Sequence, residues 1–235
     1  MNISNKAVID SWSEFSEEDL KRFGEDGDFA RQELIDPVIF QMLGATKGLN
    51  ILDAGCGNGY LSRKLARAGG IVTGVEPAAS LFEYCARKER EESLGITYFQ
   101  HDLANLDFAE NFDKILVINV LMDIPDYFAS LKNCVRALKK GGDIIISILH
   151  PAFPGSEVDW QKLGHVEIRE YFNPNPTEQR YGRLFMRPIS TYLNNLISLG
   201  CVITHVNEPQ LAKNSKSRSR NAHVPQFLII QAKKQ

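Results

Sequence analysis

The sequence predicts an α/β protein with a mostly parallel sheet and helices on both of its faces. Three observations lead to this prediction. Short apolar runs alternate with amphipathic segments from Leu49 onward, the run from Phe112 to Asn119 is apolar along most of its length, and a glycine-rich turn begins at Gly55. A strand of that kind is typical of a parallel sheet that is covered on both faces.

The expected strands and helices alternate along the chain. Periodicity and stop signals predict strands at 50–53, 71–75, 96–100, 112–119 and 144–149, and helices at 60–67, 78–88 and 127–138, the last ended by Gly141-Gly142. A helix from Pro188 to Leu199 should stop at Gly200, and two closing strands are expected at 202–206 and 227–232.

The N-terminal segment, residues 1–45, is expected to be helical. Apolar residues recur at helical intervals over 7–23, Asp28 is placed to cap a second helix, and Pro37 starts or kinks a third. We expect this segment to close as a lid or substrate cap over the main domain at 46–235, because closure would exclude water from a site.

Residues from about 150 to 187 interrupt the alternation as an insert. They are rich in aromatic residues, prolines and charges and show no clear period. Such inserts in compact domains are usually functional or disordered, and the aromatic content argues against disorder. We expect the insert to build a pocket for a small, partly apolar ligand. The alternative is that its rings only pack the insert onto the sheet.

Size and charge are those of an ordinary globular protein. The chain has 235 residues and a formal net charge of −2, so it has no overall attraction to nucleic acid or to an anionic membrane. We find no apolar run of about 18 residues and no signal peptide, and therefore expect a cytoplasmic protein. The basic stretch from Lys213 to Arg220 lacks aromatic residues and is expected to be a solvated loop.

The cysteines give no indication of a metal centre. Cys56, Cys85, Cys134 and Cys201 are widely spaced and form no CxxC pair. We expect them to be buried, reduced thiols that form neither a disulfide framework nor a zinc site.

The glycine-rich turn is the most informative segment. Gly55, Gly57 and Gly59 connect the first strand to the helix at 60–67. Glycine lets the backbone bend sharply and approach a ligand closely, and the helix N-terminus beyond offers free N–H groups. The same arrangement binds dinucleotides, so the turn alone leaves the ligand open.

Three carboxylates are expected at the carboxyl ends of successive strands. Asp53, Glu76 and Asp102 should meet at the sheet edge where ligands bind. Glu76 is placed to accept both hydroxyls of a ribose, and Asp102 to bind an exocyclic adenine amine. Each carboxylate also has a structural alternative, as a turn stabiliser, a helix-terminal charge or a helix cap. Asn119 has one too, as the polar end of its strand.

Five segments, taken in order, resemble the motifs of class I S-adenosylmethionine-dependent methyltransferases. They are LDAGCGNGYLS, VTGVEP, HDLANLDF, FDKILVINVLMDIPD and LKKGGDIIISILHP, within residues 45–150 or so. The resemblance implies a Rossmann-like fold with a seven-stranded sheet whose last strand is antiparallel. It also implies S-adenosyl-L-methionine as cofactor, S-adenosyl-L-homocysteine as product, and methyl transfer to a nitrogen, oxygen or carbon atom.

The resemblance assigns cofactor-binding roles by position. The glycine loop would line the methionyl part, Glu76 would bind the ribose, and the segment after the fourth strand would pass beside the sulfonium. The residues expected to bind the cofactor are Asp53, Ala54, Gly55, Cys56, Gly57, Asn58, Glu76, Pro77, Asp102, Leu103, Asn119, Val120 and Leu121. We also expect Arg31 to meet the cofactor carboxylate, with a surface ion pair as its alternative role.

His150 is the expected general base. It follows the fifth strand at the ligand edge, and an unperturbed histidine pKa of about 6.5 suits proton removal near neutrality. Anchoring the insert is its alternative role, and Asp123 and Tyr171 are weaker candidates. The residues expected to bind substrate are Trp12, Phe15, Met122, Phe153, Trp160, Tyr171 and Phe185.

A small-molecule methyltransferase, for example one of secondary metabolism, is the favoured function. An RNA or DNA base methyltransferase is disfavoured because Asn119-Val-Leu-Met122 lacks the Asn/Asp-Pro-Pro-aromatic run of that class, and because the chain is slightly acidic. A nicotinamide-dependent oxidoreductase is disfavoured because the glycines read GxGxG and not GxGxxG. A cofactor-binding protein without catalytic activity stays open.

Overall fold

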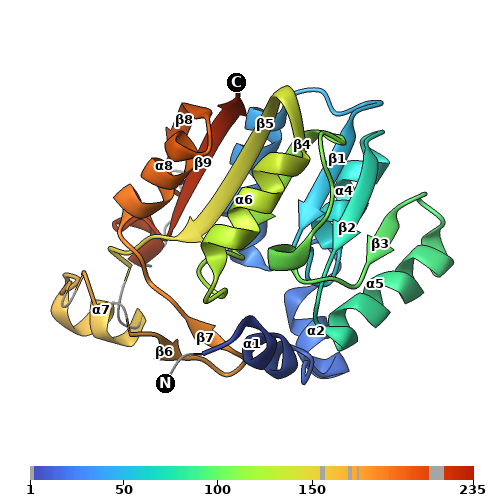
Figure 1. Ribbon diagram of the computed structural model, residues 1–235. Helices are drawn as coiled ribbons and strands as arrows, with labels where there is room; N and C mark the ends of the chain where they lie inside the picture. The colour runs from blue at the N-terminus through green and yellow to red at the C-terminus, as the bar shows by residue number, and fades with distance from the viewer. Residues whose placement is uncertain (1–2, 154–156, 169–170, 174, 212–219) are drawn as a thin grey trace.

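Seven strands form one mixed sheet in the order β3-β2-β1-β4-β5-β9-β8. We describe it from a computed structural model that covers residues 3–153, 157–168, 171–173, 175–211 and 220–235 (Figure 1). Most of the basic stretch, residues 212–219, lies outside the described residues, so its expected role as a solvated loop stays a prediction.

Only one strand of this sheet runs against the others. The parallel strands are β1 (Asn50–Ala54), β2 (Ile71–Val75), β3 (Thr97–Phe99), β4 (Phe112–Ile118), β5 (Leu138–Leu149) and β8 (Cys201–Asn207). Strand β9 (Phe227–Lys234) pairs antiparallel with both β5 and β8. The predicted fold, a Rossmann-like sheet with an antiparallel last strand, is confirmed.

Helices cover both faces of the sheet. One face carries α6 (Tyr127–Ala137), α8 (Ile189–Ser198) and the 3-10 turn η2 (Leu103–Asn105), and the other carries α3 (Asp36–Leu43), α4 (Tyr60–Arg67) and the π-helical turn η1 (Arg31–Ile35). Helix α5 (Ala79–Glu92) lies beside β3. The strands alternate accordingly, because Ile144 and Ile146 face the first layer and Ile145 faces the second.

The predicted helix over 7–23 is divided in two. Helix α1 (Asn5–Trp12) ends before Ser13, and α2 (Glu17–Phe23) begins after Ser16. The Asp19 N–H donates to Ser16 Oγ, and the Ser16 N–H donates to Asp19 Oδ2, both at 3.2 Å. This reciprocal pair is a capping box, which fixes a new helix start inside a continuous apolar pattern.

The predicted helix stop at Gly141-Gly142 is wrong. Helix α6 ends at Ala137, and β5 already begins at Leu138, which pairs with Phe112 of β4. Gly141 has φ of +76°, and the register of β4 and β5 shifts between Phe112 and Lys114. The two glycines therefore lie within an irregular strand, since glycine adopts such a backbone without a steric penalty.

The insert contains more regular structure than its sequence indicates. It holds α7 (Glu157–Leu163) and a short hairpin of β6 (Thr177–Glu178) and β7 (Arg183–Leu184). In Figure 1 this hairpin and α1 lie across the edge of the sheet where β1, β2 and β5 end. The four cysteines are buried free thiols. No helix in the described part of the chain is both long and apolar enough to cross a membrane.

The centre of the sheet should dominate the stability of the fold. Ile146 of β5 is fully buried between Val117 of β4 and Ile230 of β9. We expect Ile146→Ala to lower the free energy of unfolding by about 2–5 kcal/mol, because it leaves a cavity in the core. Val202→Ala on the edge strand β8, where Val202 is 51% exposed, should cost about 1 kcal/mol or less. Urea unfolding followed by circular dichroism measures both, and equal losses would contradict this ranking.

Candidate functional site

A cavity of about 590 Å³ opens at the carboxyl edge of the sheet. Much of its lining comes from helices α1 and α2, from the loops that follow β1, β2, β3 and β4, and from the β6–β7 hairpin. Its volume lies in the usual range for small-molecule sites. Segments that are far apart in sequence therefore enclose one site.

The glycine loop after β1 is closely packed at Gly55 and has empty space beside it at Gly57. Gly55, Gly57 and Gly59 have φ of +74°, +58° and +70°. A Cβ atom at Gly55 would lie 2.6 Å from a methyl group of Val120, whereas one at Gly57 would meet no atom within 4 Å. Since Gly57 lines the cavity, the space beside it is open to a ligand.

Glu76 fastens this loop to the end of β2. Its carboxylate accepts hydrogen bonds from the backbone N–H groups of Gly57 at 2.8 Å and Ala78 at 2.9 Å. Burial raises the pKa of Glu76 to about 7, although these two hydrogen bonds act in the opposite direction. The Glu76 side chain therefore both binds a backbone N–H at the start of α5 and lines the cavity.

Asp53 lies beneath the glycine loop. It is buried and accepts a hydrogen bond from Ser62 Oγ of α4 at 2.6 Å. Burial raises its pKa to about 6, partly offset by the Ser62 hydrogen bonds. The carboxylate thus links the end of β1 to the helix that follows the loop, and it also lines the cavity.

Asp102 combines a capping role with contact to the N-terminal segment. Its Oδ1 accepts from the Ala104 N–H at 3.0 Å, which caps η2. Asn5 Nδ2 of α1 donates to its Oδ2 at 3.3 Å. Both residues line the cavity, so α1 already contacts the carboxylate that was assigned to the adenine.

The turn after β4 completes this side of the cavity. Asn119 has φ of +56°, a left-handed conformation that asparagine tolerates better than most residues. Its N–H donates to the Ser147 carbonyl at 2.8 Å, and its Oδ1 accepts from Ser147 Oγ at 3.0 Å. These bonds tie the turn to β5, and the chain then passes Val120, Met122 and Asp123 along the cavity wall.

An aromatic cluster joins the N-terminal segment to the β6–β7 hairpin. The Phe15 ring lies 5.5 Å from the Trp12 ring and 4.4 Å from the Tyr181 ring, measured between centroids. The Tyr181 hydroxyl donates to Asp19 at 2.6 Å, and Arg180 pairs with the same carboxylate at 3.0 Å. Hydrogen bonds from Ser16 and Tyr181 lower the pKa of Asp19 to about 2, so this connection stays charged at neutral pH.

Most of the residues predicted from sequence lie in this cavity wall. The structure brings together Trp12, Phe15, Arg31, Asp53, Gly55, Cys56, Gly57, Asn58, Glu76, Pro77, Asp102, Leu103, Asn119, Val120 and Met122. Ala54 and Leu121 do not line the cavity, because their side chains are fully buried in the core beneath it. Arg31 pairs with Asp28 at 2.6 Å, the ion pair named as its alternative role.

His150 does not reach the cavity, which corrects its expected place as a base at the site. Its Nε2 lies 2.9 Å from Glu208 Oε1, and its Nδ1 accepts from the Ala152 N–H at 3.0 Å. The ring is buried with both nitrogens engaged. This geometry matches the alternative role, an anchor for the start of the insert.

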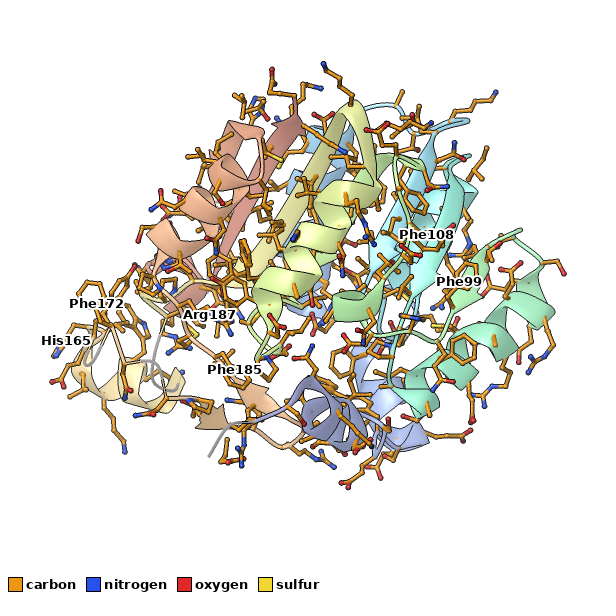
Figure 2. All side chains as sticks on the ribbon, in the orientation of Figure 1. Phe99, Phe108, His165, Phe172, Phe185 and Arg187 are labelled. Atoms are coloured by element: carbon orange, nitrogen blue, oxygen red, sulfur yellow. The ribbon has the colours of Figure 1, made fainter. Side chains whose placement is uncertain are left out.

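The predicted aromatic residues of the insert pack within the protein. Arg220 lies 3.5 Å above the Phe153 ring, Trp160 stacks on His223, and the Tyr171 hydroxyl accepts from the Ile189 N–H. The insert contacts the cavity instead through Gln179, Arg180, Tyr181 and Leu184. Figure 2 shows Phe172 at the outer end of the insert, away from Phe185 and Arg187 near α6.

Several lining residues were missed by sequence reasoning. Tyr181 and Leu184 come from the hairpin, and Gln226 and Phe227 come from the start of β9. The sequence gives one signal for the hairpin, the glycine at position 182 directly after Tyr181. In the structure Gly182 has φ of +70°, a conformation that favours glycine in a turn. No signal placed the start of β9 at this cavity, because its position depends on the order of strands in the sheet. Within the described residues no group of His, Cys, Asp and Glu has the arrangement of a metal site.

Comparison with known proteins agrees with this geometry. A family model described as a methyltransferase domain matches residues 51–142, the segment that carries the loops of the cavity. A solved S-adenosylmethionine-dependent methyltransferase from Mesorhizobium loti is 26% identical and covers 90% of this chain and 100% of its own, with a TM-score of 0.74. Residues 51–142 therefore match a methyltransferase domain, and the fold is that of the class I S-adenosylmethionine-dependent methyltransferases.

Other methyltransferases resemble this chain over part of its length. An enzyme named ubiquinone biosynthesis O-methyltransferase from Coxiella burnetii is 36% identical over 124 residues, which are 51% of this chain and 53% of the relative. The same name is given to a relative from Alkalilimnicola ehrlichii, 32% identical over 115 residues. This chain therefore matches only about half the length of these curated relatives.

The raised pKa of Glu76 predicts a pH-dependent stability for this protein. Between about pH 4.5 and 7 the folded chain keeps a proton on Glu76 that the unfolded chain has lost, so the contribution of Glu76 to the free energy of unfolding falls as pH rises through this window. Glu76→Gln removes that titration. Relative to wild type, the variant should gain about 3 kcal/mol between pH 4.5 and 8, from 1.36 kcal/mol per pKa unit.

Urea titrations of the two proteins at several pH values measure this difference. Glu110→Gln is a suitable control, because Glu110 is exposed on the surface and lies away from the cavity. A constant difference between Glu76→Gln and wild type over this range would show that Glu76 does not titrate near pH 7.

Proposed function

We propose that this chain binds S-adenosyl-L-methionine in the cavity and transfers its methyl group to a hydroxyl oxygen of a small molecule. The observation that carries the proposal is the open space at Gly57, bounded by the glycine loop and the Glu76 carboxylate. The cavity lies at the carboxyl edge of a parallel sheet, where this fold class binds its ligands.

The residues present fit an adenosyl group with a sulfonium. Each oxygen of Glu76 accepts one backbone hydrogen bond and keeps a second lone pair for a ribose hydroxyl. Asp102 and Leu103 would frame the adenine, and the Arg31 guanidinium would meet the cofactor carboxylate. The bound group supplies a methyl carbon on positively charged sulfur, which makes sulfur a good leaving group.

The protein contributes chiefly alignment and exclusion of water. Val120 packs on Gly55, so the turn after β4 is fixed against the glycine loop where the reacting atoms would meet. Trp12, Phe15 and Tyr181 close the cavity from the opposite side. A lid of this kind would open for ligand exchange and shut before transfer.

The names of the relatives support oxygen as the acceptor atom. Two of them are called O-methyltransferases of ubiquinone biosynthesis, and part of the cavity lining is apolar, with Leu149, Leu184 and Phe227. We therefore favour a hydroxylated acceptor with an apolar body. Neither name points to secondary metabolism, and we do not retain that suggestion.

Cofactor binding is the first test of this proposal. Calorimetry should give micromolar-range binding of S-adenosyl-L-methionine and of S-adenosyl-L-homocysteine, and mass spectrometry of the purified protein should detect either compound. We expect Glu76→Ala to weaken binding by about 1.5–3 kcal/mol, the range for a lost charged hydrogen bond. Unchanged affinity in this variant would remove Glu76 from the site, and a bound nicotinamide nucleotide would contradict the proposal.

Gly57→Ala separates ligand contact from backbone strain. The new methyl group would enter the open space and should weaken S-adenosyl-L-methionine binding at least about tenfold. Gly95→Ala is the matched control, since Gly95 has φ of +79° and also has nothing within 4 Å, but lies on the surface. Both variants should lose similar thermal stability, and only Gly57→Ala should lose affinity. Equal affinities in the two variants would place the ligand elsewhere.

A further inference from the structure

Asp123 lies beside the expected reaction centre. Its N–H donates to the Val120 carbonyl at 2.9 Å, which closes a tight turn after β4, and Asp123 lines the cavity with Val120 and Met122. Val120 is the residue that a Cβ at Gly55 would strike. Asp123 therefore belongs to the same tight turn as Val120, which contacts the loop that would hold the methionyl part of the cofactor.

The Asp123 carboxylate differs from the other carboxylates of the cavity wall. Asp53, Glu76 and Asp19 each accept hydrogen bonds from neighbouring residues. In the described part of the chain, no residue donates a hydrogen bond to the side chain of Asp123, although it is partly buried. Because Asp123 also lines the cavity, its carboxylate oxygens are available to accept a hydrogen bond from a bound hydroxyl group.

Arg187 fixes the turn that carries Asp123 without bonding its carboxylate. The guanidinium donates to the carbonyls of Leu121 at 2.9 Å, Ile124 at 2.8 Å and Pro125 at 3.2 Å, and it lies 4.0 Å from the centroid of the Tyr127 ring. Figure 2 shows Arg187 and Phe185 together near the end of α6. The Phe185 N–H also donates to the Met122 carbonyl, at 2.6 Å.

We propose that Asp123 is the general base that removes the proton from a phenolic hydroxyl of the acceptor. This inference rests on the proposed function. The acceptor oxygen forms a bond to the methyl carbon while the carbon–sulfur bond breaks, and the electron pair of that bond goes to sulfur. The proton of the hydroxyl goes to an oxygen of Asp123, which becomes a neutral carboxyl group.

The charge environment suits this role. Burial raises the pKa of Asp123 to about 7, and Arg187 and Arg31 act in the opposite direction. The charge of Asp123 in turn contributes to the raised pKa of Tyr192 in α8, for which burial is the largest cause. A base whose pKa lies near the operating pH is ionised in a large fraction of the molecules and still binds a proton well. A phenol is acidic enough to give its proton to such a base.

The surrounding surface suits a flat apolar ring. Ile118, Leu149, Leu184 and Phe227 line the same cavity as Asp123. Such a wall binds an aromatic body through its faces and edges, while the carboxylate is left to interact with the hydroxyl. The proposal therefore concerns a hydroxylated aromatic acceptor and not an aliphatic alcohol, whose proton is much less acidic.

Asp123→Asn tests the proposal with two probes that differ in hydroxyl acidity. The assay follows S-adenosyl-L-homocysteine formation from S-adenosyl-L-methionine with catechol, 4-alkylcatechols or 4-nitrocatechol at pH 8.5. For the less acidic catechols we expect kcat/KM to fall by about 10²–10⁴-fold, the contribution of a general base. With 4-nitrocatechol, which is largely ionised at this pH, the loss should be only a few-fold. A role confined to structure would lower the rate with all probes alike.

Two further measurements complete the experiment. The acidic limb of the wild-type pH–rate profile, near pH 7, should disappear in Asp123→Asn, and the difference in free energy of unfolding between the two proteins should change between pH 5 and 8.5. Asp126→Asn is the matched control, because this residue lies in the same segment outside the cavity and asparagine can keep its helix cap. It should behave as wild type.

The outcomes separate this inference from the proposed function. Equal losses with all catechols, or an unchanged pH profile in Asp123→Asn, would overturn the role of Asp123. Wild-type protein that binds S-adenosyl-L-methionine but methylates none of the catechols would overturn the phenolic acceptor and leave the methyltransferase proposal standing. Absence of S-adenosyl-L-methionine binding would overturn both.

Discussion

The candidate site depends on one buried interaction, the pair of hydrogen bonds that the Glu76 carboxylate accepts from the backbone N–H groups of Gly57 and Ala78. It ties the glycine loop after β1 to the beginning of the segment after β2. A carboxylate in this position is costly to bury, and the two hydrogen bonds offset part of that cost. This carboxylate therefore holds the glycine loop at Gly57, the position where the space beside the backbone is open.

The regular part of the fold is readable from sequence because its signals are local. The apolar strands and the helix at 60–67 follow from periodicity, and β2 and α4 have the predicted bounds. The division of the first helix could also have been read, since Ser16 and Asp19 form a capping box. The start of β5 at Leu138 could not, because an irregular pairing with β4 overrides the stop signal of two glycines.

The site is readable only where one motif carries the residues. The loops after β1, β2 and β4 are continuous with motifs, and their side chains line the cavity. The insert has no such pattern, so its aromatic content suggested ligand contact where Phe153 and Trp160 in fact pack against Arg220 and His223. The role of His150 could not be predicted for the same reason. Its position at the end of β5 suggested a place at the ligand edge, but its hydrogen-bond partner Glu208 lies 58 residues away in sequence.

The two ends of the cavity are built from separate parts of the chain, and this separation matters for how such a protein diversifies. The end proposed for the adenosyl group comes mainly from loops of the sheet itself, with Asn5 of α1 against Asp102. The rest of the wall draws on α1, α2 and the β6–β7 hairpin, and Asp19 of α2 bonds to the hairpin. Under the proposed function, exchanges in the hairpin can change the wall around the acceptor without disturbing Glu76 and the glycine loop. Selection can then act on acceptor choice and on donor affinity almost independently. The bonds of Asp19 to Tyr181 and Arg180 are where a change in one part would affect the other.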